Sequence, residues 1–92
     1  MTAYSAQEVA THLPSLPDWK IEGGELTRSF SFQDFLLALD FVNRVGRLAE
    51  EAGHHPDIDI RYNRVRLALV THDQGGLTEK DFSLAAKVDH LA

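Results

Sequence analysis

The 92-residue sequence contains no cysteine, so disulfide bonds, thiolate nucleophiles and thiolate metal ligands are excluded. A chain without cysteine suits a reducing compartment. Its N-terminal residues also lack the basic segment and apolar run of a secretory signal. We therefore expect a cytoplasmic protein.

Long apolar runs and excess positive charge are missing as well. No apolar stretch approaches the roughly 20 residues that a membrane-spanning helix needs, so we expect no membrane association. Nine Lys and Arg stand against 14 Asp and Glu, a formal net charge of -5. Because the basic residues are scattered and the net charge repels phosphate backbones, we expect no direct nucleic-acid binding.

The remaining composition is that of an ordinary globular protein, with 43% hydrophobic and 25% charged residues. The length predicts a single domain over residues 1–92. Three helix starts are marked by a hydroxyl residue with an acidic residue three positions later. These pairs are Ser5 with Glu8, Ser31 with Asp34, and Thr78 with Asp81. The apolar periodicity after each pair predicts helices over residues 5–12, 32–52 and 79–91.

Two hairpins are expected between these helices. Gly23-Gly24 separates strands at 19–22 and 25–30, because both glycines accept a positive φ. Asn63-Arg64 is predicted to turn between strands at 58–62 and 65–72. The resulting order, α-β-β-α-β-β-α, predicts an α+β fold with a four-stranded antiparallel sheet and helices packed on one face.

The long predicted helix carries two apolar stripes when it is projected at 100° per residue. The first comprises Phe32, Phe35, Leu36, Leu39, Val42 and Ala49; the second, on roughly the opposite side, comprises Leu37, Phe41, Val45, Leu48 and Ala52. One sheet cannot cover both stripes. The second is expected to pack on another helix or on a second subunit, and we favour a homo-oligomer, either dimer or tetramer.

Three of the five histidines fall between residues 54 and 72. Gly53 suits the left-handed position that ends a helix, and Pro56 holds His55 in an extended conformation. His54 and His55 should therefore lie on a stiff corner after the long helix. Closure of the second hairpin returns His72 to this corner, so we predict that the three imidazoles converge at one edge of the sheet.

Spacing alone leaves three interpretations of this cluster open. Imidazoles can give and take protons near neutral pH, which suits acid–base catalysis. With Asp57, Asp59 or Asp73 nearby, the same side chains could bind a metal such as zinc. They could also be polar surface residues at the ends of strands.

The residues around the histidines resemble those of the pterin-4a-carbinolamine dehydratases, which include the 4a-hydroxytetrahydrobiopterin dehydratases. The shared pattern is E-x-x-x-H-H-P, an aromatic residue, T-H and a downstream aspartate. Here it reads Glu50, His54, His55, Pro56, Tyr62, Thr71, His72 and Asp81. The resemblance runs from about Trp19 to the C-terminus and is strongest between residues 50 and 81. Ile58 departs from it, because many relatives have an aromatic residue two places after the proline.

The resemblance implies dehydration of a 4a-hydroxytetrahydropterin to quinonoid dihydropterin, with neither a metal nor an organic cofactor. It implies that His54 and His72 transfer protons and that His55 binds and orients the pterin. Further substrate contacts are expected from Glu50, Pro56, Thr71, Asp73 and Asp81.

For two of these residues, a purely structural role stays open as an alternative. Asp81 completes a capping box with Thr78, and Glu50 either orients a histidine or swings into solvent. The alternative function is a non-catalytic dimerisation or scaffold protein that uses the apolar face of the long helix.

Overall fold

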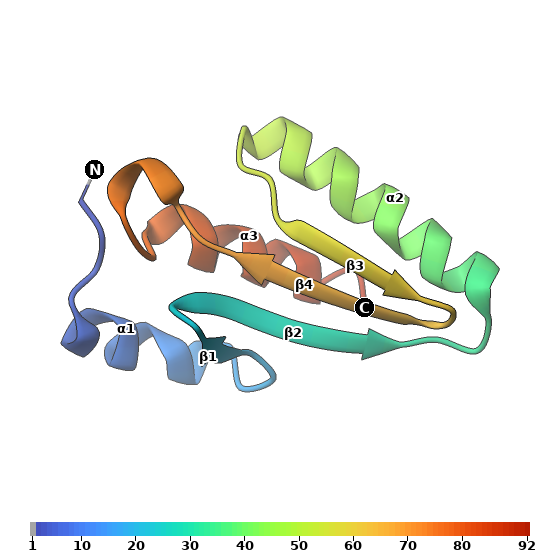
Figure 1. Cartoon of the computed structure of the whole chain (residues 1–92), viewed down its shortest axis with the longest axis horizontal. Coiled ribbons are helices and arrows are strands. Elements are labelled where there is room, and N and C mark those ends of the chain that lie inside the picture. The colour runs from blue at the N-terminus through green and yellow to red at the C-terminus, as the bar shows by residue number, and fades with distance from the viewer. Residues whose placement is uncertain (1) are drawn as a thin grey trace.

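Four antiparallel strands form one sheet in the order β1-β2-β4-β3 (Figure 1). The structure, a computed structural model, describes residues 2–92. The strands are β1 (Lys20–Glu22), β2 (Glu25–Ser31), β3 (Asp57–Arg61) and β4 (Arg64–Leu69). The hairpins β1-β2 and β3-β4 are joined by the central pairing of β2 with β4, which leaves β1 and β3 at the edges.

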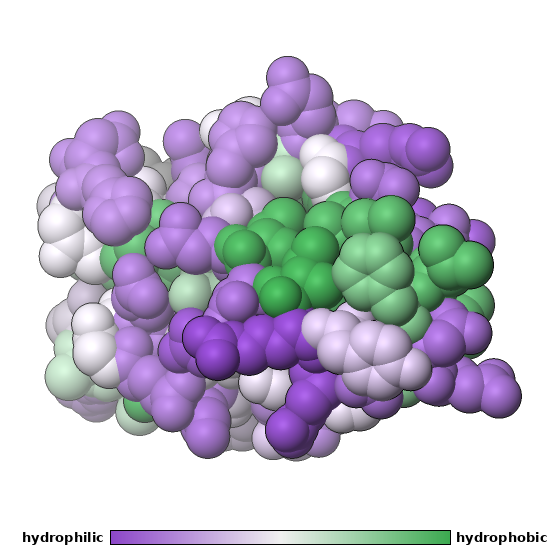
Figure 2. Space-filling view, turned by 45° about the vertical axis from the view of Figure 1, so that its right-hand side comes forward, coloured by the Kyte–Doolittle hydropathy of each residue, from purple (hydrophilic) through white to green (hydrophobic). Residues whose placement is uncertain are grey.

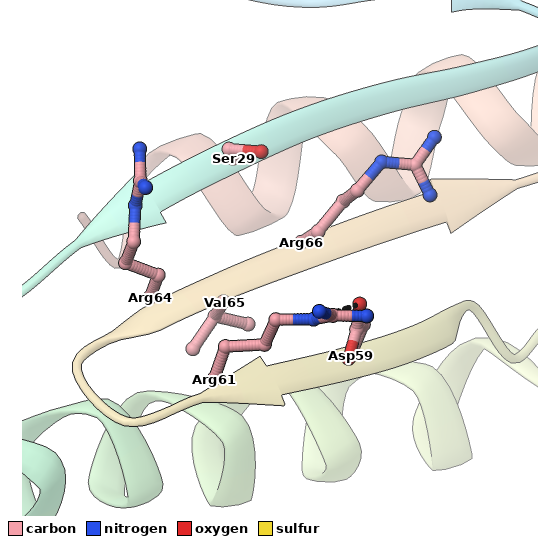
Figure 3. A pocket seen from close by; sticks show the side chains of 6 residues that line it. All are labelled: Ser29, Asp59, Arg61, Arg64, Val65 and Arg66. Carbon is pink, nitrogen blue, oxygen red and sulfur yellow. Dashed lines mark hydrogen bonds and ion pairs between the residues drawn. The ribbon is translucent and has the colours of Figure 1, made fainter.

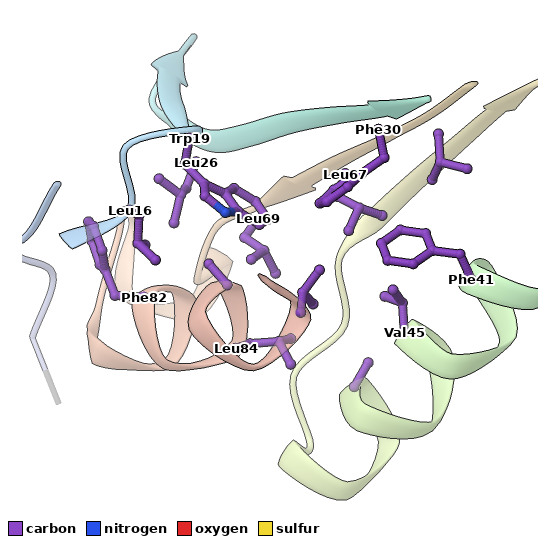
Figure 4. Packing of buried hydrophobic residues seen from close by; sticks show 14 of the residues in the cluster. Leu16, Trp19, Leu26, Phe30, Phe41, Val45, Leu67, Leu69, Phe82 and Leu84 are labelled. Carbon is purple, nitrogen blue, oxygen red and sulfur yellow. The ribbon is translucent and has the colours of Figure 1, made fainter. Parts of the chain in front are cut away.

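The helices are α1 (Ala6–His12), α2 (Phe35–Ala52) and α3 (Glu79–Asp89). Both α2 and α3 pack on the same face of the sheet (Figure 4). The predicted α+β fold and its element order are confirmed. Two short 3-10 helices, Leu13–Ser15 and His72–Gln74, were not expected.

The core lies between the sheet and these two helices. The central strands contribute Leu26, Phe30, Val65, Leu67 and Leu69, all at most 5% exposed. The helices contribute Phe41, Val45, Phe82, Leu84 and Val88, and the segment before β1 adds Leu16 and Trp19 (Figure 4). Burying each large apolar side chain stabilises the fold by about 1.5–3 kcal/mol. A polar anchor supports the core: Trp19 Nε1 and Arg28 both donate to Asp89 Oδ1, at 2.8 and 2.6 Å.

The structure corrects the predicted arrangement of stripes on α2. Its buried residues are Ala38, Phe41, Val45 and Ala49, which lie along the seam between the two stripes. The stripes therefore flank one buried face and are not on opposite sides. Phe35, Leu36 and Leu37 remain exposed on these flanks, Leu36 at 73%.

The structure shifts several of the approximate predicted boundaries, including those of α2, the second hairpin and β4. Helix α2 starts at Phe35 with Asp34 as its cap, whose side chain accepts from the Leu37 N–H, while Ser31 is still part of β2. The second hairpin turns at Tyr62-Asn63, with Tyr62 at φ 53°, instead of at Asn63-Arg64. Strand β4 ends at Leu69, so His72 follows the strand within a 3-10 turn.

Among residues 2–92, no helix combines the length and the apolar character required to cross a membrane.

Candidate active site

The end of α2 sets the direction in which His54 and His55 leave the helix. Gly53 is left-handed, at φ 62° and ψ 30°, and its N–H bonds to the carbonyls of Ala49 and Glu50. The His54 N–H also reaches the Ala49 carbonyl, at 3.1 Å. A side chain at residue 53 would strain this conformation. The helix therefore ends immediately before His54 and His55, which begin the link to β3.

His54 is held by a buried carboxylate. Its Nε2 lies 2.5 Å from Asp81 Oδ1, and the Asp81 side chain is fully buried while that of His54 is 10% exposed. An ionised carboxylate can only accept hydrogen bonds, so the proton lies on His54 Nε2. The ring nitrogen left free to exchange a proton with a ligand is Nδ1.

The other Asp81 oxygen is fixed by two threonines. Oδ2 accepts from the Thr71 hydroxyl at 2.8 Å and from the Thr78 N–H at 2.9 Å. Because Thr71 gives its one proton to Asp81, the Thr78 hydroxyl must donate in the 2.8 Å contact between the two threonines. Within residues 2–92, no buried side-chain nitrogen or oxygen lacks a partner. This network joins the end of α2, the segment after β4 and the start of α3.

His55 is held more loosely than His54. Its Nε2 lies 2.8 Å from Glu50 Oε1, one helical turn back along α2. Both side chains are well exposed, so water competes for the contact and screens it. Glu50 therefore orients His55 without fixing it.

His72 reaches the same corner from β4. Thr71 pairs with Gly76 in an isolated bridge, and the 3-10 turn His72–Gln74 lies inside the loop that this bridge closes. Gly75, at φ 73°, lets the chain turn back toward Gly76. The bridge thus holds His72 at the mouth of the site although the strand has already ended.

These elements enclose a pocket of about 370 Å³. Its lining includes all three histidines together with Thr71 and Asp73. Glu50, Pro56 and Asp81 are not among the lining residues: Glu50 and Asp81 contact histidines instead, and Pro56 lies half-buried in the link to β3. Three lining residues were not predicted, namely Gly53, Val70 and Lys80. Lys80 could have been found, because it belongs to the first turn of the helix that Thr78 caps.

A second pocket of about 370 Å³ lies on the opposite, open face of the sheet, near the β3-β4 turn (Figure 3). It is lined by Ser29, Asp59, Arg61, Arg64, Val65 and Arg66. A guanidinium group does not release its proton near neutral pH. Of these two pockets, only the one lined by histidines carries imidazole groups, the side-chain type that can both donate and accept protons near neutral pH. Within residues 2–92, no three His, Asp or Glu side chains are grouped so that they could hold a metal ion.

The model of the family "Pterin 4 alpha carbinolamine dehydratase" matches residues 2–91. The chain belongs to this family. A relative from Chloroflexus aurantiacus, named "Putative pterin-4-alpha-carbinolamine dehydratase", is 58% identical and aligns over 99% of this chain and 98% of its own. The resemblance seen in the histidine motif thus extends over the described chain.

Two solved structures share the fold of this carbinolamine dehydratase family member. A transcriptional coactivator/pterin dehydratase from Brucella melitensis has a TM-score of 0.93 and 35% identity, with 99% of each chain covered. A pterin dehydratase-like protein identified as a RuBisCO assembly factor in the alpha-carboxysome has a TM-score of 0.65 and 28% identity. That alignment covers 80% of this chain and 86% of the other.

Proposed function

We propose that the protein dehydrates a 4a-hydroxytetrahydropterin to quinonoid dihydropterin and water by histidine acid–base catalysis. The observation that carries this proposal is that His54, His55 and His72 together line one pocket, behind which a buried carboxylate orients His54. Its volume lies within the range typical of small-molecule sites. The substrate that we propose as the standard for comparing pterins is the carbinolamine of tetrahydrobiopterin, whose side chain is neutral.

The reaction requires two proton transfers. The C4a–O bond breaks, and the departing oxygen takes a proton and leaves as water. N5 loses its proton, and its electron pair forms the C4a=N5 double bond. A general acid and a general base on the two sides of this bond would each contribute about 10²–10⁴-fold to the rate.

His54 and His72 suit different proton transfers. We assign the base to His54, because its Nδ1 is free and the ionised Asp81 stabilises the imidazolium that forms when Nδ1 takes the N5 proton. We assign the acid to His72, which is exposed and can regain its proton from solvent. After one turnover His72 is neutral and His54 protonated, and exchange with water restores both.

The remaining predicted residues then have distinct roles. His55, oriented by Glu50, binds the pterin, while Thr71 and Asp73 line the pocket. Asp81 is a positioning residue, because it is buried behind His54 and does not line the pocket. Pro56 shapes the link between His55 and β3.

Two measurements test the proposal. The purified protein should accelerate formation of quinonoid dihydropterin from the carbinolamine above the buffer rate. In NMR spectra, titration with a non-reactive dihydropterin should shift the imidazole signals of His54, His55 and His72 and leave those of His12 and His90 in place. A wild-type rate equal to that of buffer, or uniform shifts over all five histidines, would reject the proposal.

We also propose that the protein forms a homo-oligomer through β3. All five β3 residues are exposed at a sheet edge, where unpaired backbone groups can pair with another strand. Antiparallel pairing of β3 with a second copy, centred on Asp59, sets Asp57 opposite Arg61 in both directions, so the edge is complementary to itself. Figure 2 shows an apolar band on one face of the molecule, and Ile58 and Ile60 of β3 and Leu36 of α2 are exposed, so apolar contact can add to this pairing.

The two edge strands provide a matched test of this interface. Ile58 on β3 and Ile21 on β1 are both 38% exposed. By analytical ultracentrifugation, Ile58→Lys should shift the protein toward monomer, whereas Ile21→Lys should sediment like the wild type. Equal behaviour of the two variants would contradict the β3 interface.

The same apolar band favours the second candidate, a scaffold protein. The relative that is an assembly factor shows that the fold occurs in a protein of that kind. A monomeric wild type with no turnover would favour this function over catalysis.

A further inference from the structure

A third pocket, called the groove below, adjoins the histidine pocket at His54 and Lys80. It has a volume of about 240 Å³ and is lined by residues of α3 and of the C-terminal end of α2. Its lining residues include Ala52 of α2 and Lys80, Ser83, Leu84 and Lys87 of α3. Because His54 and Lys80 line both pockets, a ligand held among the histidines can extend past them into this groove.

The groove concentrates unpaired positive charge in an acidic protein. Two of the chain's three lysines, Lys80 and Lys87, lie on one stripe of α3 with Ser83 between them. Within residues 2–92, neither ammonium group has a carboxylate within 4.0 Å, although the third lysine, Lys20, pairs with Glu22 at 3.5 Å. The two lysines are therefore free to bind an anion.

The one carboxylate that lines the groove is already engaged. Glu79 Oε2 accepts a hydrogen bond from the Tyr4 hydroxyl at 2.8 Å, which ties it to the segment before α1. This bond raises the pKa of Tyr4. Glu79 is thus directed to the N-terminal segment and does not neutralise Lys80 or Lys87.

We propose that this groove binds an anionic group, a carboxylate or a phosphate, on the substituent of the pterin's pyrazine ring. The inference rests on the proposed function, since it takes the ring to lie among the histidines. Lys80 and Lys87 are seven residues apart, about 10 Å along the helix axis. Lys80 would meet the start of the substituent, while Lys87 and the Ser83 hydroxyl would meet its charged end. A neutral side chain would leave both ammonium groups without a partner.

The test compares three carbinolamine substrates that share the ring and differ in the end of the tail: a neutral hydroxyl, a carboxylate or a phosphate. The measured quantity is the ratio of KM for each anionic substrate to KM for the neutral one. In the wild type this ratio should be below one and should rise toward one with added salt. Lys87→Gln should raise the ratio about fivefold, the scale of one exposed charge pair, while Lys87→Arg should keep it low. Lys20→Gln, which removes a lysine far from the groove, is the matched control and should behave like the wild type.

Every outcome of this experiment is informative. A carboxylate preference alone or a phosphate preference alone would support the groove and identify its ligand. Equal KM values for all three substrates in the wild type, or an unchanged ratio in Lys87→Gln, would overturn the inference. If no substrate turned over, the proposed function would fail, and calorimetric Kd values of the corresponding dihydropterins would decide on the groove by the same ratio.

Discussion

Three imidazoles lie just beyond the open end of the β3-β4 hairpin and three guanidinium groups lie toward its turn, and the two sets are held in different ways. At the first end, His54 contacts a carboxylate that is fully buried and fixed by two threonines. At the second, Arg61 pairs with Asp59 at 3.2 Å, but the two side chains are 81% and 50% exposed. Arg66 reaches Glu22 at 3.0 Å on the same open face.

Burial decides what each end can do. The buried carboxylate fixes the ring and the tautomer of His54, as the proposed proton transfer at a defined atom requires. The arginine pairs are solvated, and exposed pairs contribute only about 0–1 kcal/mol each. Arg61 and Arg64 are direct neighbours across the strands, a repulsive contact that solvent screens. Charged or polar groups are present at both ends, but only the histidine end contains a buried carboxylate that fixes one of its side chains.

The largest difference between the two ends should appear when a histidine is removed. His54→Ala and His72→Ala should each lower kcat for carbinolamine dehydration by about 10²–10⁴-fold, since each removes one proton-transfer group. Arg64→Ala, at the arginine end, should keep kcat near the wild-type value. Circular dichroism of all three variants would verify that they fold. A histidine variant as active as Arg64→Ala would remove the distinction between the ends.

The two aspartates should differ in stability as well as in activity. Asp81→Asn should lower the free energy of unfolding by about 2–4 kcal/mol, because it disturbs a buried hydrogen-bonded charge. If the amide oxygen of the new Asn side chain accepts the bonds from Thr71 and Thr78, its NH2 group faces His54 Nε2. The ring proton of His54 would then move to Nδ1, and kcat would fall. Asp59→Asn, in the exposed pair, should change stability by no more than about 0.5 kcal/mol. Urea unfolding with parallel kinetics measures both effects, and equal losses in the two variants would contradict the role of burial.

A smaller effect is expected where a histidine contact is exposed like the arginine pairs. Glu50→Gln should raise KM for the pterin by about two- to fivefold with little change in kcat, because it weakens only the orientation of His55. The neighbouring Glu51→Gln is the control, since Glu51 is exposed on another side of the helix. Steady-state kinetics would decide, and the role of Glu50 would be wrong if the two variants matched.

The smallest effect should come from Glu22 at the arginine end. The Thr27 hydroxyl, and after it Arg66, donates to this carboxylate and lowers its pKa below the ordinary value of 4.5. A lowered folded-state pKa stabilises the fold above pH 4.5, and this contribution is lost as the pH falls through the folded-state pKa. Glu22→Gln should therefore lower Tm slightly at pH 7 and by less at pH 3, while Glu25→Gln should leave Tm unchanged at both pH values. A larger Tm difference at pH 3 than at pH 7 would reverse the expected sign.

Local signals in the sequence were sufficient where a few neighbouring residues determine the structure. The Gly23-Gly24 turn has positive φ at both positions, and the capping boxes at Ser5 and Thr78 form as predicted. Ser31 carries the same signal, yet it stays in β2 because the Phe32 N–H bonds to the Asn63 carbonyl across the sheet. Tyr62 takes a left-handed conformation that is rare for an aromatic residue, which displaced the predicted turn by one position.

The candidate site likewise contains features that the sequence could predict and features that it could not. The approach of His72 to His54 and His55 follows from hairpin closure, and the structure places all three around one pocket. The contact between His54 and Asp81 joins residues 27 positions apart and depends on how α3 docks, so spacing could not reveal it. Lys80 and the groove beyond it depend on the same docking.

During synthesis, His54 leaves the ribosome 27 residues ahead of Asp81, the group that holds it. Thr71, Thr78 and Asp81 come from the segment between β4 and the first turn of α3, so the network cannot close before that helix packs. A nascent chain that has formed only its hairpins would display the three imidazoles with His54 unrestrained. Activity should therefore appear late in folding, together with the docking of α3, and a partly folded chain should be catalytically silent.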